Sequence, residues 1–283
     1  MSYYKIKSYA KINLSLGVIK KLNSNYHKIE SIVSFIDLHD EIFIKKINNK
    51  YHKIFFYGKF KKNINQKNTI SKLLKILDER KKLKDQKYFI KIKKNIPNKS
   101  GLGGGSMNAS SILMYFFKQS KIKISNKETI EISNKVGSDV ILGLRKKNSA
   151  LFSNGKLSRY NNKLGLYTLL IKPNFGCSTK LIYKKINSYS RPHLIKNNQN
   201  KLFKINFIKN LNNDLEKYAF KTYPNLLFLK KFMLNLPKVL FVRMTGSGST
   251  MIAYFLSKKT CFQAAKILKK KYKNYWCIIS KTI

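Results

Sequence analysis

The chain has few acidic residues, few arginines and few cysteines. Cys177, Cys261 and Cys277 are widely spaced and form no C-x-x-C pair, so the sequence indicates neither a zinc site nor a disulfide framework and favours buried free thiols. No run of about 18 apolar residues occurs, which argues against a membrane span. Residues 1–7 lack the apolar segment of a signal peptide. We therefore expect an untargeted, cytoplasmic protein.

The scarcity of acidic residues leaves a large positive charge. Twelve Asp and Glu stand against 59 Lys and Arg, for a formal net charge of +47. Planar, bidentate recognition of phosphate and guanine favours arginine, yet nearly all the cations are lysines spread along the chain. Lys, Asn, Ile, Tyr and Phe are enriched together, which is typical of an A/T-rich mutational bias. We expect non-specific polyanion binding at low salt as a by-product, and no specific nucleic-acid partner.

The length of 283 residues and the hydrophobic fraction of 43% suit two domains with buried cores. Strand and helix patterns alternate without a regular βαβ order, which favours an α+β fold over a doubly wound sheet. Near residues 150–170 the pattern changes to short strands separated by Asn and Gly turns. We place the domain boundary here, giving domains 1–155 and 156–283.

Hydrophobic periodicity predicts the elements of each domain. The expected strands span 3–9, 12–19, 29–35, 40–46, 53–57, 88–92, 149–152, 167–172, 239–243, 250–255 and 276–280. The expected helices span 69–77, 109–117, 126–136, 213–220, 226–234 and 261–272, and residues 191–200 are expected to form a loop. Asn68 is a predicted N-cap, and Ser125 with Glu128 is a predicted capping box.

A glycine-rich segment runs from Pro97 to Asn108, with the sequence PNKSGLGGGSMN. Four glycines in five positions destroy local propensity and let the backbone approach a ligand closely. The apolar stripe that follows makes the segment the start of a helix, whose first N–H groups and dipole bind anions. Ser106 and Asn108 can add side-chain hydrogen bonds to a phosphate or a metal-bound water.

Three interpretations of this segment compete. A Walker A loop requires Gly-Lys-Ser/Thr, whereas the chain has Gly105-Ser106-Met107. A dinucleotide fingerprint requires a third glycine where Ser106 stands, and an acidic residue about 20 positions later that is missing. A purely structural loop is the third interpretation, and loops so dense in glycine are rarely only structural. The segment therefore predicts nucleotide phosphate binding.

Lys11 and Asp139 carry weaker signals. Asp139 directly follows a predicted helix, and phosphoryl transfer requires a carboxylate that orients or deprotonates the attacking hydroxyl. Its local pattern is equally typical of a turn aspartate that caps the next element. Lys11 interrupts a β-type run, and in a lysine-rich chain this is typical of a solvated strand lysine. Taken alone, both patterns favour a structural role.

Two further segments are candidates for substrate contacts. Thr245-Gly-Ser-Gly248-Ser is a tight turn between apolar strands, typical of a hairpin or of a backbone that approaches a substrate. Tyr26 and His27 can stack on and hydrogen-bond a base, although lone histidines are usually incidental.

Taken together and in this order, these segments resemble the GHMP kinase superfamily. The similarity covers almost the whole chain. The marks are Ala10-Lys-Ile-Asn13-Leu, Tyr26-His27, Phe35-Ile-Asp37-Leu-His-Asp40, Gly101-Leu-Gly-Gly-Gly-Ser106-Met-Asn108, Gly137-Ser-Asp139-Val and Thr245-Gly-Ser-Gly248. The resemblance implies a ribosomal-S5-like N-terminal domain, a ferredoxin-like C-terminal domain and an active site between them.

The resemblance also implies roles for individual residues. Lys11 and Asp139 would be the catalytic pair, in which Asp139 accepts the proton of the acceptor hydroxyl and Lys11 holds that hydroxyl. Asn68 would lie near the nucleotide base. The ATP phosphates, with Mg²⁺, would be bound by Pro97, Gly101, Leu102, Gly103, Gly104, Gly105, Ser106 and Asn108. The acceptor would be bound by Asn13, Tyr26, His27, Thr245, Gly246 and Gly248.

Within the superfamily, the marks are most similar to those of members that phosphorylate a cytidine-diphosphate-linked methylerythritol in non-mevalonate isoprenoid synthesis. The alternative acceptors are homoserine and a mevalonate-like alcohol, which carry no base for Tyr26 and His27. A nucleic-acid-binding module is a distant third hypothesis. A monomer or a homodimer is expected.

The chain departs from the usual family pattern at four places. Lys99-Ser100 replaces Gly-Gly, and Met107 replaces a serine. Residues 153–156, Ser-Asn-Gly-Lys, replace Gly-x-Gly-Glu, and residues 23–25 replace an Asp-Gly turn. Lost hydroxyl contacts at Ser100 and Met107 are expected to weaken ATP binding.

Overall fold

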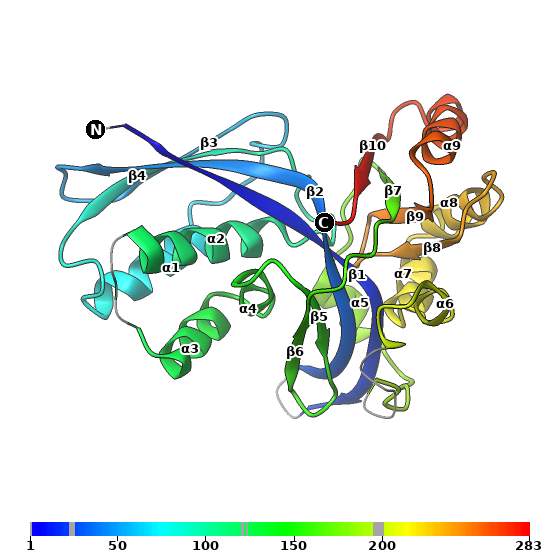
Figure 1. The fold of residues 1–283 in the computed structure, drawn as a ribbon, viewed down its shortest axis with the longest axis horizontal. Helices are drawn as coiled ribbons and strands as arrows, with labels where there is room; N and C mark the ends of the chain where they lie inside the picture. Colours follow the sequence, from blue (N-terminus) through cyan, green and yellow to red (C-terminus); the bar gives the residue numbers. More distant parts are fainter. Residues whose placement is uncertain (1, 23–25, 120–121, 123, 195–200) are drawn as a thin grey trace. The chain divides into compact units, whose positions relative to one another are not determined.

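The computed structural model describes residues 2–22, 26–119, 122, 124–194 and 201–283 (Figure 1). The expected turn at 23–25 and part of the expected loop at 191–200 lie outside these ranges. The chain forms two compact units, which are described separately. Unit 1 comprises residues 1–11, 38–98 and 103–146, and unit 2 comprises 12–37, 99–102 and 147–283.

Unit 1 is a sheet with helices packed on one face. Its strands follow the order β3 (Lys53–Tyr57), β4 (Lys87–Lys93), β2 (His27–Ile47), with β2 antiparallel and β3 parallel to β4. Helices α1 (Thr69–Glu79), α2 (Gly104–Gln119) and α3 (Asn126–Val136) cover the sheet (Figure 1). Alternate residues of β2 and β4, such as Ile44 and Ile90, point into this core because side chains alternate across a strand.

Unit 2 contains a four-stranded antiparallel sheet in the order β10-β7-β9-β8. Its strands are β7 (Tyr167–Lys172), β8 (Phe241–Met244), β9 (Met251–Phe255) and β10 (Trp276–Lys281). Its main helices are α7 (Leu215–Thr222), α8 (Asn225–Leu234) and α9 (Lys258–Lys271). One hydrophobic core joins these helices to β7, β8 and β9. This order confirms the ferredoxin-like expectation.

Shorter elements complete the fold. In unit 2, β5 (Asn148–Leu151) pairs with β2 and with β6 (Leu157–Tyr160). Helices α5 (Thr179–Lys184) and α6 (Ile205–Ile208) also belong to unit 2, and α4 (Val140–Gly143) belongs to unit 1. Helices α4, α5 and α6 were not expected, because one helical turn leaves too short a periodic pattern to detect.

The first two strands are longer than the sequence pattern predicts. β1 (Tyr4–Lys21) is continuous where two strands were expected, and β2 also joins two expected strands. Polar residues at the expected breaks, including Lys11 and Asp40, are buried within the strands instead of ending them. Both strands pass from one unit to the other, so no single cut in the sequence separates the units; the boundary placed at 155 remains a prediction.

The helix starts are partly as expected. Asn68 is the N-cap of α1 and forms a full capping box with Ser71. Ser125 is the N-cap of α3 and accepts the Glu128 N–H at 3.1 Å. The capping box predicted for Glu128 is wrong, because its carboxylate pairs with Arg80 at 3.3 Å and with Lys82 at 3.0 Å. Two cationic partners outcompete one neutral N–H.

The three cysteines are free thiols, as the sequence predicts. Burial raises the pKa of Cys177 and of Cys261 to about 12 and that of Cys277 to about 11, which keeps all three protonated. Within the part of the chain that the structure describes, no helix has both the length and the apolar character needed to cross a membrane.

Candidate active site

The predicted site residues divide between the two units. Unit 1 holds Lys11, Asn68, Pro97, Gly103, Gly104, Gly105, Ser106, Asn108 and Asp139. Unit 2 holds Asn13, Tyr26, His27, Gly101, Leu102, Thr245, Gly246 and Gly248.

Lys11 and Asp139 form an ion pair in unit 1, with Lys11 Nζ 3.2 Å from Asp139 Oδ2. The Lys11 side chain is 5% exposed, because β1 is buried on both sides of it, so it is not a solvated strand lysine. Asp139 precedes α4 but makes no capping hydrogen bond with its side chain. Both structural interpretations therefore fail. A buried ammonium holds a carboxylate that is 36% exposed and accessible to a substrate hydroxyl.

The backbone of the glycine segment packs directly against Lys11. Gly103 has φ +67°, and a Cβ there would lie 2.8 Å from Lys11 Cγ. Any side chain at this position would therefore displace the catalytic lysine. The glycine allows both the left-handed conformation and the close approach.

Helix α2 begins at Gly104, five residues before the expected start at 109, because Gly104 and Gly105 are themselves helical. The first helical hydrogen bond joins Met107 N to Gly103 O at 2.9 Å. The N–H groups of the preceding turn thus have no partner within the helix, as an anion-binding site requires. The Ser106 hydroxyl lies in this turn, and a Cβ on Gly137 would lie 3.6 Å from it, two residues from Asp139.

Asn68 acts on this helix start indirectly. Its Oδ1 accepts from Ile70 N and Ser71 N, and its Nδ2 donates to the carbonyls of residues 65 and 66. The amide is thus used within its own segment. The neighbouring Thr69 hydroxyl donates to Gly105 O at 2.9 Å and thereby fixes the first turn of α2.

Two departures from the family pattern have a structural explanation. Lys99 has φ +49°, so the backbone keeps a conformation that favours glycine at a position where the family usually has one. Met107 is 2% exposed, and a Cβ on Gly143 of α4 would lie 2.9 Å from its sulfur. Met107 therefore points into the interior of unit 1 and fills space between α2 and α4.

In unit 2 the incoming arm of the glycine segment packs on the turn between β8 and β9. The Thr245 hydroxyl accepts from Asn13 N at 3.1 Å and donates to Gly101 O at 3.2 Å. Gly101 has φ +76°, and a Cβ there would lie 2.1 Å from Thr245 O. The Asn13 amide donates to Ser31 Oγ at 2.9 Å.

The turn itself contains two glycines with positive φ, Gly246 at +53° and Gly248 at +85°. The Asn213 amide, which the sequence did not indicate, donates to Met244 O and Gly246 O at 2.8 Å each. Leu102 is fully buried. The segment is therefore both a β-hairpin turn and a backbone that touches the glycine loop.

His27 lies in an aromatic group of unit 2. Its ring centroid is 5.1 Å from that of Tyr183 and 6.4 Å from that of Tyr189. Burial, and then the charge of Lys21, lower the pKa of His27 below its usual 6.5, so the ring is neutral at pH 7. The neighbouring Tyr26 is 71% exposed. Sequence reasoning missed Tyr183 and Tyr189, because nothing distinguishes them among 17 tyrosines.

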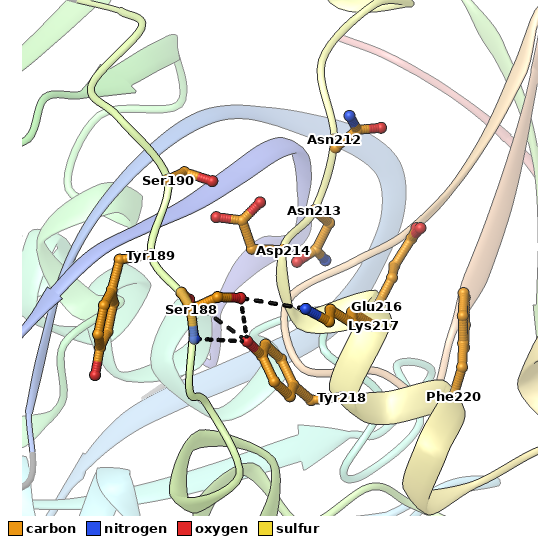
Figure 2. Close-up of a pocket in the computed structure, with 10 residues that line it drawn as sticks. All are labelled: Ser188, Tyr189, Ser190, Asn212, Asn213, Asp214, Glu216, Lys217, Tyr218 and Phe220. Carbon is orange, nitrogen blue, oxygen red and sulfur yellow. Dashed lines mark hydrogen bonds between the residues drawn. The ribbon is translucent and has the colours of Figure 1, made fainter.

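A pocket of about 350 Å³ in unit 2 was also missed (Figure 2). The Tyr218 hydroxyl accepts from Ser188 N at 3.1 Å, and Lys217 Nζ donates to Ser188 Oγ at 3.3 Å. Its wall is thus a fixed polar network, and Tyr189 belongs to the same wall. The lining residues are Ser188, Tyr189, Ser190, Asn212, Asn213, Asp214, Glu216, Lys217, Tyr218 and Phe220.

Comparison with known proteins accounts for these features. The GHMP kinases N terminal domain matches residues 68–151, and the GHMP kinases C terminal domain matches residues 192–274. A 4-diphosphocytidyl-2-C-methyl-D-erythritol kinase from Pelagibacter ubique is 53% identical over 283 residues, covering 100% of both chains. The chain belongs to the GHMP kinase family.

Solved structures agree with this GHMP kinase fold. A crystal structure of 4-(cytidine 5'-diphospho)-2C-methyl-D-erythritol kinase matches with a TM-score of 0.77 at 20% identity, covering 98% of this chain and 99% of the other. A homoserine kinase from Cytophaga hutchinsonii matches with a TM-score of 0.75 at 16% identity, covering 100% and 95%. This GHMP kinase is therefore a small-molecule kinase, and the family implies ATP as its phosphoryl donor.

Proposed function

We propose that this GHMP kinase transfers the γ-phosphoryl group of ATP to the 2-hydroxyl of 4-diphosphocytidyl-2-C-methyl-D-erythritol, a step of non-mevalonate isoprenoid synthesis. The observation that carries the acceptor is the 53% identity to the Pelagibacter ubique enzyme over the full length of both chains. The solved structures alone do not select an acceptor, because the TM-score of the homoserine kinase is nearly as high.

The chemistry rests on the ion pair of Lys11 and Asp139. In the proposed reaction Asp139 accepts the proton of the attacking hydroxyl, and the Lys11 ammonium, 3.2 Å away, orients the carboxylate and the hydroxyl. The unsatisfied N–H groups of Gly104, Gly105 and Ser106 bind the negative charge of the phosphate oxygens.

Mg²⁺ is proposed as the metal ion that accompanies ATP. Oxygen ligands suit this ion, and the Ser106 hydroxyl and the Asp139 carboxylate supply them close to the first turn of α2. When bound, Mg²⁺ neutralises charge on the phosphates. The chain's own residues orient the acceptor and bind the phosphoryl oxygens.

Acceptor recognition is assigned to unit 2. Exposed Tyr26 and the neutral ring of His27 offer a stacking surface and a hydrogen-bonding group for cytosine. Asn13 and the Thr245–Gly248 turn are assigned to the rest of the acceptor. We further propose a cytoplasmic enzyme that works as a monomer or a homodimer without a specific nucleic-acid partner.

A panel of acceptors tests this function. Purified protein with Mg-ATP is given the diphosphocytidyl substrate, homoserine or mevalonate, and ADP release is followed by a coupled assay. Turnover with only the cytidine compound is expected. Preferential turnover of homoserine or mevalonate would assign the chain to another branch of the family.

A further inference from the structure

Asp40 is a buried carboxylate that the proposed chemistry does not use. It lies in β2, in unit 1, and is 0% exposed. Its Oδ1 accepts from Asn95 N at 2.7 Å and from Ile96 N at 2.8 Å. Its Oδ2 accepts from the Asn108 amide at 2.9 Å and from the ammonium of Lys94.

These four donors come from the two ends of the glycine-rich segment. Lys94, Asn95 and Ile96 lead into it, and Asn108 leaves it in the first turns of α2. Each oxygen of Asp40 thus binds the main chain or a side chain of a different end. The carboxylate closes the base of the loop formed by residues 97–107.

Only a carboxylate meets this demand. An asparagine amide has one accepting oxygen and a donating nitrogen, so it cannot accept at both positions. The Lys94 side chain is 4% exposed, and its buried ammonium requires an anionic partner. A Cβ on Gly104 would lie 3.4 Å from Lys94 Nζ, so the ion pair also lies directly against the first residue of α2.

We propose that Asp40 is a positioning residue for ATP: it ties both ends of the glycine loop together and so fixes the N–H groups that bind the phosphates. Asn108 then serves this closure through Asp40, in place of the direct phosphate contact that its sequence position predicts. The inference rests on the proposed function only in taking ATP as the ligand of the loop.

The alternative is a purely structural role. A buried ion pair that only stabilised unit 1 would change the melting temperature and leave the ratio of the two substrate KM values unchanged. A positioning role affects ATP selectively, because the N–H groups of α2 would lose their fixed orientation while the acceptor contacts remain.

The experiment compares Asp40→Asn, Asn108→Asp and the double variant that exchanges the two residues. Each single variant breaks the closure: Asp40→Asn removes the charge that balances Lys94, and Asn108→Asp puts two carboxylates together. The exchange restores one amide and one carboxylate. Binding of Mg-ATP is measured by calorimetry without acceptor, and KM is measured for both substrates.

Each single variant is expected to raise the Kd for ATP about tenfold or more, the scale of a lost charged hydrogen bond, while the acceptor KM stays within about twofold. The exchange is expected to recover most of this loss. Asn108→Ala keeps the pair of Asp40 and Lys94 and serves if Asp40→Asn fails to fold. Asp78→Asn, which loses the 2.9 Å bond to Lys87, is the control for stability alone.

Parallel changes in both KM values, an unchanged Kd for ATP, or no recovery in the exchange would overturn the proposal. Because ATP binding is measured without an acceptor, a wild-type protein that binds ATP but leaves the cytidine compound unphosphorylated would refute the proposed acceptor and not the role of Asp40.

Discussion

The buried ammonium of Lys11 lies 3.2 Å from the half-exposed carboxylate of Asp139, and both belong to the same compact unit. The pair combines a fixed cation with an anion that a substrate can reach. Neither residue has any other arrangement in its local sequence that indicates catalysis, so the pair is a product of the fold.

Replacing Asp139 with asparagine is expected to lower kcat by about 10²–10⁴-fold, because the amide cannot accept a proton from the hydroxyl. The change keeps the size of the side chain, so circular dichroism and the melting temperature are expected to stay close to those of the wild type. Turnover is measured with the coupled assay. Near-normal kcat in Asp139→Asn would refute the assigned mechanism.

Gly103→Ala is expected to impair both stability and kcat. At φ +67° an alanine costs about 1–2 kcal/mol, and its Cβ would in addition press on the Lys11 side chain. Gly155→Ala is the matched control, because Gly155 has φ +85° and nothing within 4 Å of a Cβ. The control is expected to lose stability in urea unfolding and to keep kcat; equal kcat in both variants would contradict the contact with Lys11.

The binding of the cytidine substrate is expected to depend on pH through His27. Its pKa is lowered from 6.5 by burial and by Lys21, so the ring is neutral at pH 7 and gains a proton only at more acidic pH. The acceptor KM should therefore be constant between about pH 7 and 8 and rise as the pH falls below 6.5. His27→Asn should have a higher KM with no such rise; an unchanged profile in this variant would exclude His27 as the titrating group.

Thr245→Val is expected to destabilise the protein by about 1–3 kcal/mol, because it leaves the buried Asn13 N–H without its acceptor. Thr245→Ser keeps the hydroxyl and should lose less. Urea unfolding of both variants measures the difference. Equal losses would show that the methyl group of Thr245, and not its hydrogen bonds to Asn13 and Gly101, stabilises this turn.

Most of the fold could be predicted from the sequence. Helices such as α1 and α9 follow a clear periodicity, and the ordered motifs predicted the family that the two domain matches confirm. The continuity of β1 and β2 could not be predicted, because Lys11 and Asp40 look like strand breaks until the fold supplies Asp139 and Lys94 as partners.

The candidate site was less accessible to sequence reasoning. The glycine segment has a strong local signal, and so the start of α2 was found with an error of five residues. The role of Asp40 depends on main-chain N–H groups of residues 95 and 96, which every sequence has and no motif records. Tyr183 and Tyr189 gain meaning only from their distance to His27.

The passage of β1 and β2 through both units has a consequence for how the protein is made. Asp214 accepts the N–H of Val18 at 2.7 Å, and Asp214 N donates to Leu16 O at 2.8 Å. The second unit therefore borrows its first strands from the segment that the ribosome releases earliest, and these strands must wait for partners that emerge last. A fragment of residues 156–283 would lack them, so the two halves of this kinase cannot be exchanged between relatives as independent modules.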